Sequence, residues 1–429
     1  MKRSLTLALL AALFSCGFLA AQSKLTPAQR QLNTDSFEYV WKTIRDKHWQ
    51  TPPAGIDWQA VHDELRPAIE KAESMEAARA VMGDMIGRLH QTHFGIIPSD
   101  LYSDMDGSHE TGESNTGLDL RVVGTQALVT KVEAGSSAAT EGVKPGWQIL
   151  KVANTDLEPI ITKLNESYAK STLRDLVLHR AILSRLQGKL GDKIAVEFLD
   201  GVNQHVTKTL TEGKPRGTRT QFGNLTPMHV WFESEKVGGN IGYVSFNIFL
   251  DPSRLMNLFG EAVQSCQKCD GFVVDLRGNP GGIGGMAMGM AGFFIDKPGE
   301  KLGTMYMRGA TLKFVVNPRA TPFSGPVAIL VDGNSASTSE ILAGGLQDLG
   351  RVRVFGSRTA AAALPSVFEI LPNGDGFQYA IANYISEGGK PLEGLGVKPD
   401  VETPITRQAL LDGKDPALDA AIDWIKSKP

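Results

Sequence analysis

At 429 residues the chain exceeds the size at which one hydrophobic core stops growing, roughly 250 to 300 residues, so we expect two or three domains. Its composition, 42% hydrophobic and 21% charged, is that of an ordinary folded protein. The formal net charge of -3 provides no basic surface for DNA, RNA or anionic lipid, which excludes nucleic acid as a partner.

The first residues have the pattern of a secretory signal peptide. Lys2 and Arg3 precede an apolar run, residues 5–21, that ends in small residues. Because this run is slightly short for a retained membrane anchor, we expect a cleaved signal peptide over residues 1–22. The mature protein is then periplasmic or secreted, with no membrane insertion. The residues before Cys16 also resemble a bacterial lipoprotein processing site, which leaves a lipid anchor at Cys16 as an alternative.

Two further cysteines, Cys266 and Cys269, form a C-x-x-C at the predicted end of a helix. Structural zinc normally needs four ligands, and the sequence has no second cysteine pair. We therefore expect either a local disulfide or two free thiols. Because the sequence has neither a ligand cluster nor a phosphate-binding loop, we expect no metal and no organic cofactor.

Residues 24–100 have the period of amphipathic helices. Apolar residues recur there at i, i+3 and i+4, as at Phe37, Val40 and Trp41. The polar stretch that follows, residues 99–116, has the composition of a linker. We predict a helical N-terminal domain over residues 24–100, with a domain boundary in this linker.

Residues 113–212 have enough strands and helix for a small domain of their own. Glycine turns separate short predicted strands at 118–122, 127–132, 149–152 and 194–198, and a helical run covers 173–186. We predict a separate β-rich domain here.

From Gly239 onward, strands and helices alternate. The predicted strands are 241–246, 272–276 and 326–332, and the predicted helices cover 255–263, a stretch after Gly282, and 337–349. Apolar strands bounded by helices imply βαβ units around a largely buried sheet. We predict an α/β core over residues 213–410 and a C-terminal helix over 411–429.

The motif VDGNSASTSE, residues 331–340, places a serine where a strand turns into a helix. At a helix N-terminus, Ser337 would lie among unpaired backbone N–H groups and the positive end of the helix dipole, which favour a developing oxyanion. The alternative is that Ser337 or Ser335 only caps the helix, with Glu340 completing a capping box.

A second motif, VVDLRGNPGG, covers residues 273–282 and ends a buried strand in a turn. Gly281 and Gly282 could expose backbone amides toward a ligand there. Both motifs follow strands, so we expect them side by side where open α/β sheets bind ligands. We expect Asp275 and Arg277 to pair and hold the turn.

These two motifs, together with the tail LEGLGVKPD, resemble the core motifs of the tail-specific (carboxy-terminal processing) serine protease family. Residues 116–152 resemble the PDZ domain that precedes that core, with a carboxylate-binding loop at Gly117, Leu118, Asp119 and Leu120. The resemblance implies a crotonase/ClpP-like protease core, a PDZ-like domain over 113–212 that recognises substrate C-termini, and a protein or peptide substrate.

The resemblance further implies that Ser337 is the nucleophile. The oxyanion hole would be the Thr338 N–H together with that of Gly281 or Gly282. Family members with a Ser-Lys dyad carry the lysine in G-x-x-T-x-G-K, but here Ala362 occupies the lysine position. Ser366 stands where those members have a supporting glutamine. Without a base, a serine hydroxyl is a weak nucleophile.

A related branch, similar to the core of tricorn protease, suggests another base. In that pattern His93 takes the serine proton, Thr92 assists through its hydroxyl, and Glu393 orients or tunes the imidazole. We therefore predict Ser337, His93, Glu393 and Thr92 as the catalytic residues.

Two alternatives remain open at the level of sequence. Lys390 or Lys398 could replace the missing amine. The run Ala360 to Ala363 is also compatible with an inactive protease fold that binds peptides or small apolar ligands. Hydrogen-bond reach between His93 and Ser337 would distinguish an enzyme from a binding protein.

Overall fold

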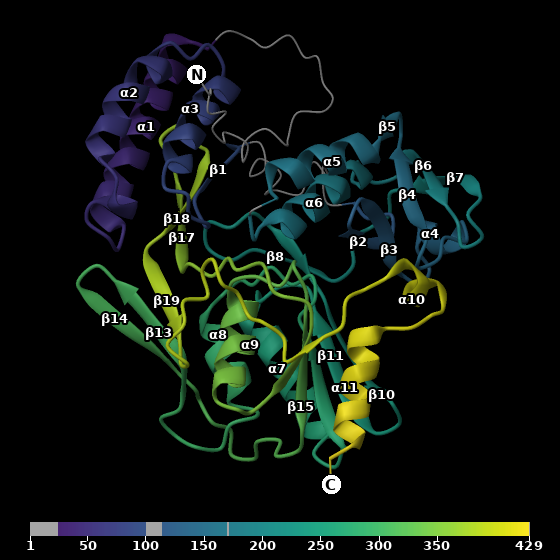
Figure 1. Ribbon diagram of the computed structural model, residues 1–429. Coiled ribbons are helices and arrows are strands. Elements are labelled where there is room, and N and C mark those ends of the chain that lie inside the picture. The colour runs from purple at the N-terminus through teal and green to yellow at the C-terminus, as the bar shows by residue number, and fades with distance from the viewer. Residues whose placement is uncertain (1–24, 100–113, 170, 429) are drawn as a thin grey trace.

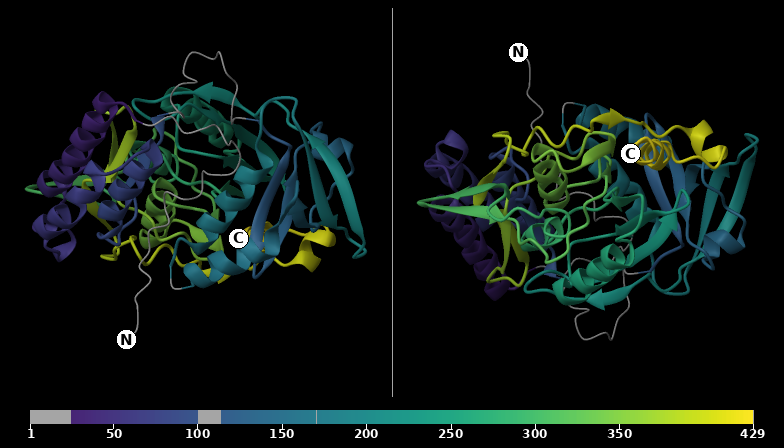
Figure 2. Two further views of the ribbon diagram at one scale, coloured as in Figure 1. Left: turned by 90° about the horizontal axis from the view of Figure 1, so that it is seen from above. Right: turned by 90° about the horizontal axis from the view of Figure 1, so that it is seen from below.

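The computed structural model describes residues 25–99, 114–169 and 171–428. The expected signal peptide, Cys16 and most of the expected linker lie outside these residues. Three groups of elements share the molecule: a helical unit, a β-rich middle unit (residues 114–212) and an α/β core (Figure 1). The helical and middle units lie at opposite ends of the molecule (Figure 2), and the core lies below both of them in the view of Figure 1. Within the described residues, no helix is long and apolar enough to cross a membrane.

The helical unit consists of α1 (Pro27–Lys47), a 3-10 turn (Pro53–Gly55), α2 (Trp58–Glu70) and α3 (Met75–Gly87). Side-chain oxygens of Thr26, Asp57 and Ser74 accept backbone N–H groups at the three helix starts, as N-caps do. The apolar faces of these helices share one core with a three-stranded sheet of β1 (Gly95–Ile97), β18 (Gly376–Ala380) and β17 (Ser366–Ile370). This sheet joins the N-terminal unit to a distant part of the chain.

The middle unit contains an antiparallel sheet in the order β2-β3-β4-β6-β7. Its strands are β2 (Leu118–Val123), β3 (Gln126–Val132), β4 (Gln148–Val152), β6 (Lys193–Leu199) and β7 (His205–Thr211), and β5 (Thr155–Asp156) pairs with β4. Its helices are α4 (Ser137–Thr140), α5 (Leu157–Ser167) and α6 (Arg174–Leu183), the last followed by a 3-10 turn (Ser184–Leu186). All four predicted strands are confirmed, and β2 is an edge strand beside α6.

The core contains a six-stranded sheet in the order β10-β11-β12-β15-β16-β20, parallel except for the β10–β11 pair. Its strands are β10 (Phe232–Val237), β11 (Ile241–Phe246), β12 (Gly271–Asp275), β15 (Val327–Val331), β16 (Arg353–Gly356) and β20 (Val401–Glu402). On one face lie α7 (Pro252–Ser265), α8 (Gly285–Ala291) and α9 (Thr338–Asp348), and on the other α11 (Pro416–Lys426). The predicted mixed α/β class is confirmed.

Alternation along the central strands explains the two covered faces. In β12, Phe272 and Val274 pack with α7, α8 and α9, whereas Val273 packs with α11. Because side chains of a strand alternate between faces, a strand that is apolar at every position must be covered on both sides.

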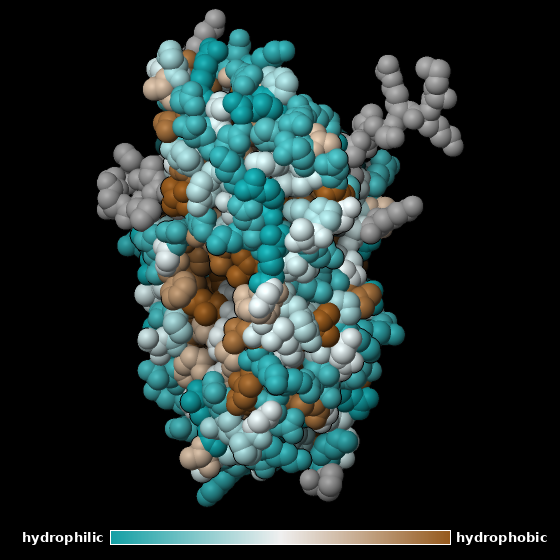
Figure 3. Space-filling model, turned by 90° about the vertical axis from the view of Figure 1, so that its left-hand side faces the viewer, coloured by the Kyte–Doolittle hydropathy of each residue, from teal (hydrophilic) through white to brown (hydrophobic). Residues whose placement is uncertain are grey.

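Several elements were not predicted. They include α5 and β7 in the middle unit, the sheet of β14 (Ala310–Val315), β13 (Lys301–Met307) and β19 (Ala382–Ser386), the pair β8 (Thr218–Thr220) and β9 (Met228–Val230), and α10 (Arg407–Leu411). The β13–β14 hairpin projects from the core (Figure 1) and exposes Tyr306, Leu312 and Val315. Apolar side chains surround a hollow on this side of the molecule (Figure 3). Of the two cysteine alternatives, the disulfide Cys266–Cys269 is present at the end of α7.

Candidate active site

The two sequence motifs lie side by side at the carboxyl ends of neighbouring strands, as predicted. Strands β12 and β15 run parallel, with Asp275 opposite Leu330. The loops that follow are joined by the Ser339 hydroxyl, which donates to the Asn279 carbonyl at 2.9 Å, and by the Asp332 carboxylate, which accepts the Gly278 N–H at 2.9 Å. Both loops are therefore fixed against each other at one edge of the sheet.

The pair Asp275 and Arg277 has the predicted structural role. The Arg277 guanidinium lies 2.6 Å from the Asp275 carboxylate and 2.7 Å from that of Asp415, the N-cap residue of α11. The glycine-rich turn is thereby tied to the helix on the opposite face of the sheet.

Ser337 occupies the turn from β15 into α9 in a strained conformation, with φ 54° and ψ -115°. A non-glycine residue at such angles costs about 1 to 3 kcal/mol and is typical of functional sites. The turn holds this shape because the Ser337 N–H donates to the Ala362 carbonyl at 2.8 Å and to the Glu340 carboxylate at 3.0 Å. The capping hydrogen bond of Glu340 is thus present together with the strained conformation of Ser337.

Glu340 organises the loop that would otherwise carry the family lysine. Its fully buried carboxylate accepts hydrogen bonds from the Thr359 hydroxyl at 2.5 Å and from the amides of Ala361 and Ala362 at 2.9 and 3.0 Å. Burial raises the pKa of Glu340 to about 7, although the donated hydrogen bonds favour the ionised form. One side chain therefore fixes the nucleophile turn and the neighbouring loop together.

The expected oxyanion donors surround Ser337. A Cβ on Gly281 would lie 2.7 Å from the Ser337 Cβ and 2.8 Å from the Thr338 nitrogen, so only glycine permits this approach. The Gly281 N–H donates to the Asn279 side chain at 2.9 Å. In the described part of the chain, the amides of Gly282 and Thr338 have no acceptor. The Thr338 hydroxyl donates to the Gly282 carbonyl at 2.8 Å, which keeps the two residues together.

Thr92 and His93, just before β1, form a hydrogen-bonded chain with Glu393 from the loop between β19 and β20. The Thr92 hydroxyl donates to the Glu393 carboxylate at 2.9 Å, and the Thr92 N–H donates to the same carboxylate at 3.1 Å. The Thr92 oxygen lies 2.7 Å from His93 Nδ1. Because the single hydroxyl proton goes to the carboxylate, the oxygen must accept Nδ1–H from the imidazole. In neutral His93 this leaves the lone pair on Nε2.

The peptide unit between Ala362 and Ala363 connects the two halves of the site. Its carbonyl accepts the Ser337 N–H at 2.8 Å, and its N–H donates to the Glu393 carboxylate at 3.0 Å. No direct hydrogen bond joins His93 to Ser337 in the described structure, and such contacts commonly tighten only when substrate is bound.

Burial sets the charge state of the predicted base. Burial, together with the smaller effect of the nearby positive charge of Arg180, lowers the pKa of half-buried His93 to about 4. Burial also raises the pKa of Glu393 above its usual value, against the hydrogen bonds that it accepts. The imidazole is therefore neutral at neutral pH, the form that accepts a proton.

An apolar cluster fills the region around the position of the family lysine. Ala336, Ala360 and Ala362 are buried there, and Leu173 from the start of α6 packs against them. Lys390 and Lys398, the two alternative amines, are exposed, whereas an amine base needs desolvation to lose its proton near neutral pH. In the described residues no set of three or more His, Cys, Asp or Glu side chains is arranged to hold a metal ion.

The expected carboxylate-binding residues Gly117, Leu118, Asp119 and Leu120 lead into the edge strand β2. The Leu120 carbonyl accepts a hydrogen bond from Arg121 at 2.7 Å, and the Leu120 N–H donates to the Asp119 carboxylate at 2.8 Å. Arg121 also donates to Asp332 in the nucleophile turn at 2.6 Å. Sequence reasoning missed this link, although a single arginine inside the apolar strand pattern LDLRV was a signal for it.

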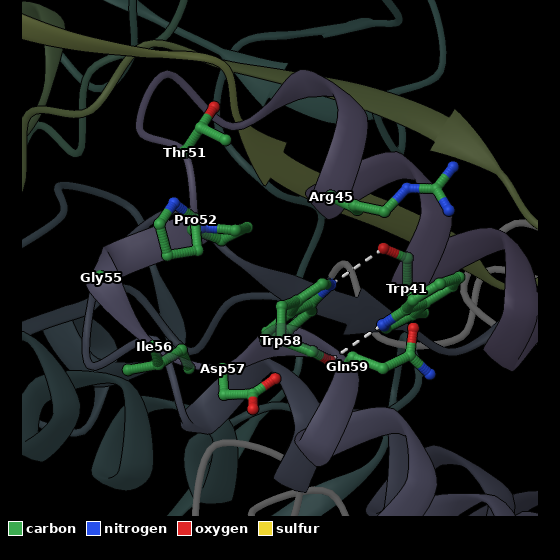
Figure 4. A pocket seen from close by; sticks show the side chains of 10 residues that line it. Trp41, Arg45, Thr51, Pro52, Gly55, Ile56, Asp57, Trp58 and Gln59 are labelled. Carbon is green, nitrogen blue, oxygen red and sulfur yellow. Dashed lines mark hydrogen bonds between the residues drawn. The ribbon is translucent and has the colours of Figure 1, made fainter.

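A separate pocket lies in the helical unit (Figure 4). It has a volume of about 530 Å³ and is bounded by Trp41, Trp58 and the loop between them. The two indole N–H groups donate to each other's backbone carbonyls at 3.0 Å, so neither points to a ligand. None of the predicted catalytic residues lines this pocket.

Comparison with known proteins covers nearly the whole chain. Residues 240–403 match the model of peptidase family S41, and residues 31–87 match that of the tricorn protease C1 domain. A carboxyl-terminal-processing protease of Synechocystis sp. is 25% identical over 400 residues, which cover 90% of this chain and 85% of that protein. A probable CtpA-like serine protease of Staphylococcus aureus is 26% identical over 343 residues, or 78% of this chain and 62% of that protein.

Solved structures share the fold at lower identity. The photosystem II D1 C-terminal processing protease has a TM-score of 0.57 at 20% identity, covering 94% of this chain and 98% of that one. Mature CPAF has a TM-score of 0.62 at 13% identity, covering 93% and 97%.

The S41 match includes both motif loops and the tail that carries Glu393. The fold and these matches define a serine-type peptidase that acts on proteins or peptides. Residues 240–403 therefore carry a peptidase family S41 domain, and most of the chain is similar to carboxyl-terminal-processing proteases.

Proposed function

We propose that this peptidase is an exported endopeptidase in which Ser337 is the nucleophile and His93 the general base. The observation that carries the proposal is the peptide unit Ala362–Ala363, which hydrogen-bonds to the Ser337 amide on one side and to the Glu393 carboxylate on the other. Glu393 in turn reaches His93 through Thr92. The basis for export is the pattern of residues 1–22 alone.

In this mechanism Ser337 Oγ attacks the scissile carbonyl while its proton moves to His93 Nε2. The oxyanion of the tetrahedral intermediate accepts the amides of Thr338 and Gly282, the two without another acceptor in the described residues. The imidazolium then protonates the leaving amine, and the C–N bond breaks to give an acyl-enzyme. Water, deprotonated by the same imidazole, attacks the ester and releases the acid.

Thr92 and Glu393 orient the base in this proposal. With Nδ1–H donated to Thr92, only Nε2 can accept the serine proton. The carboxylate also stabilises the imidazolium that forms, through the polarised threonine hydroxyl. An imidazole thus supplies the proton transfer for which other family members use a lysine.

We further propose that the middle unit is a PDZ-like domain that binds the C-terminus of the substrate. The edge of β2 could pair with an extended peptide after the Leu120 carbonyl exchanges its contacts with Arg121 and with the His179 ring, which lies 3.0 Å away. Because Arg121 also contacts Asp332, a peptide bound at this edge would act on a residue that is hydrogen-bonded to the nucleophile turn.

The test is cleavage of casein by the purified mature chain, compared with Ser337→Ala and His93→Asn. Asparagine is chosen because His93 has φ 60° and asparagine tolerates left-handed backbone. His90→Asn is the matched control, since His90 is exposed, also has positive φ and lies three positions away. We expect at least a 1000-fold loss for the first two variants and wild-type activity for the control.

Wild-type protein that is folded but inert toward casein and peptides across pH would overturn the proposal. The non-catalytic peptide-binding alternative would then describe the molecule.

A further inference from the structure

We propose that Arg180 on α6 binds a carboxylate of the substrate about three residues from the scissile bond. The enzyme then prefers an acidic side chain or a free chain end at that position. This inference rests on the proposed function in taking Ser337 as the point of attack.

The phase of α6 places Arg180 on the side of the nucleophile. Leu173, directly before the helix, packs against Ala336 and Ala362 beside Ser337. Seven residues further, an α-helix presents the same face again, about 10 Å along its axis. Arg180 is that residue. The opposite side of α6, which includes Leu178 and Ile182, is buried in the middle unit.

Arg180 carries a charge without a partner. Its side chain is exposed, and the described residues provide it with neither an ion pair nor a hydrogen bond. By contrast, Arg174 on the same helix pairs with Asp175 at 2.9 Å. Burial nevertheless lowers the pKa of Arg180, the pattern of a charge surrounded by protein on several sides but reached by water. A guanidinium in such a position is suited to a carboxylate.

The separation fits an extended peptide. Arg180 lies about 10 Å along α6 from Leu173, which packs beside Ser337. A strand rises about 3.3 Å per residue, so this distance corresponds to three residues between the attacked carbonyl and the group held by Arg180. Arg180 also lies close enough to His93 for its charge to act on the imidazole. A carboxylate bound at Arg180 would neutralise that charge while the substrate is present.

Binding tests this inference without catalysis. The Ser337→Ala variant is used so that the peptides are bound but not cleaved. Fluorescence anisotropy measures its affinity for three labelled twelve-residue peptides, which share one sequence rich in Ala, Leu and Gly. The first has one central glutamate and an amidated end, the second a glutamine and a free C-terminal carboxylate, and the third a glutamine and an amidated end.

We expect one or both acidic peptides to bind about tenfold more tightly than the neutral one, as one charge-assisted contact would give. Arg180→Gln should abolish this difference. Lys163→Gln, which removes an exposed charge from α5, should leave it intact. The peptide that binds more tightly than the neutral one shows whether Arg180 holds an acidic side chain or a free C-terminal carboxylate. Equal binding of all three peptides, or an advantage that survives Arg180→Gln, would refute the role.

A second readout separates this site from the catalytic proposal. Arg180→Gln removes the cation beside His93, so the acid limb of the pH-activity profile should move to higher pH, which a purely structural role would not produce. If the wild type cleaves nothing but the charge-dependent binding persists, the catalytic proposal fails and the carboxylate site stands.

Discussion

The state of His93 is set by a hydrogen bond on Nδ1 and by partial burial of the ring. The hydrogen bond to Thr92 selects the tautomer, and burial keeps the ring neutral. The two effects act together, because a base at neutral pH needs both an available lone pair and no proton on it. Neither effect requires the lysine that Ala362 replaces.

The pH dependence of activity follows from the lowered pKa of His93. Neutral imidazole is the active form, so kcat/KM should rise as the pH increases through about 4 and be nearly constant from pH 5.5 to 8. An ordinary histidine, with a pKa near 6.5, would be mostly protonated at pH 5.5. The measurement is a pH-rate profile on a short peptide, with circular dichroism at each pH to confirm folding. Half-maximal activity near pH 6.5 would contradict the assigned environment.

At the scale of elements, the sheet β1-β18-β17 brings the base to the nucleophile. His93 lies two residues before the first residue of β1, which pairs with β18 through Gly95 opposite Gln378. The loop at residues 357–365, which contacts both Ser337 and Glu393, leads directly into β17. Displacement of β1 would therefore move His93 away from the rest of the site.

A buried ion pair secures this sheet to the helical unit. Asp375, fully buried in the β17–β18 turn, lies 2.8 Å from the Arg79 guanidinium on α3. Arg79→Ala would leave a buried carboxylate without its cation, a change that typically costs about 3 to 5 kcal/mol. We expect a lower urea midpoint and a parallel loss of activity.

Two controls accompany this prediction. Arg88→Ala breaks an exposed pair with Glu64 at 2.8 Å and should cost less than about 1 kcal/mol. Adding Asp375→Asn to Arg79→Ala removes the stranded charge and should recover part of the stability. Equal midpoints for Arg79→Ala and Arg88→Ala would show that the buried pair does not secure the sheet.

The predictability of these elements depended on burial. Strands β11, β12 and β15 were found from sequence because they are buried along nearly their whole length and bounded by turn residues. Strand β14 was missed because nearly all of its side chains are exposed, which leaves no apolar pattern to recognise.

The active site could be predicted only in part from the sequence. Ser337 and the glycine turn could be predicted because each motif is local. Their adjacency followed from the parallel order of β12 and β15. Roles for Thr92 and Glu393 could be proposed by resemblance, but their contact depends on pairing between β1 and β18, which no local pattern encodes. Arg121 was missed because its contact with Asp332 exists only once two units dock.

At the scale of the whole molecule, three polar attachments of the middle unit to the core add to the packing of Leu173 against Ala336 and Ala362 in the described part of the chain. Arg121 contacts Asp332 in the nucleophile turn, and Lys131 lies 2.9 Å from Glu233 at the start of β10. The third attachment is α10, a short strap between the last core strand and α11. Because these contacts lie on different elements, the unit is held in a defined orientation relative to Ser337.

The strap depends on Arg407, which donates to the carbonyls of Gly146 and Asp200 at 3.0 and 2.5 Å and to the Asn203 side chain at 2.7 Å. We expect Arg407→Ala to loosen this end of the middle unit, because water must replace several contacts made by one rigid guanidinium. Amide hydrogen exchange should accelerate by roughly tenfold in residues 146–148 and 199–203. It should remain unchanged in α9.

The matched control is Arg353→Ala, which removes a guanidinium that lies over the Trp424 ring on the other side of the core. This variant should leave exchange in the middle unit at the wild-type rate. Acceleration confined to Arg407→Ala would identify α10 as the element that orients the peptide-binding edge. Unchanged exchange in Arg407→Ala would instead mean that Arg121 and Lys131 hold the unit without the strap.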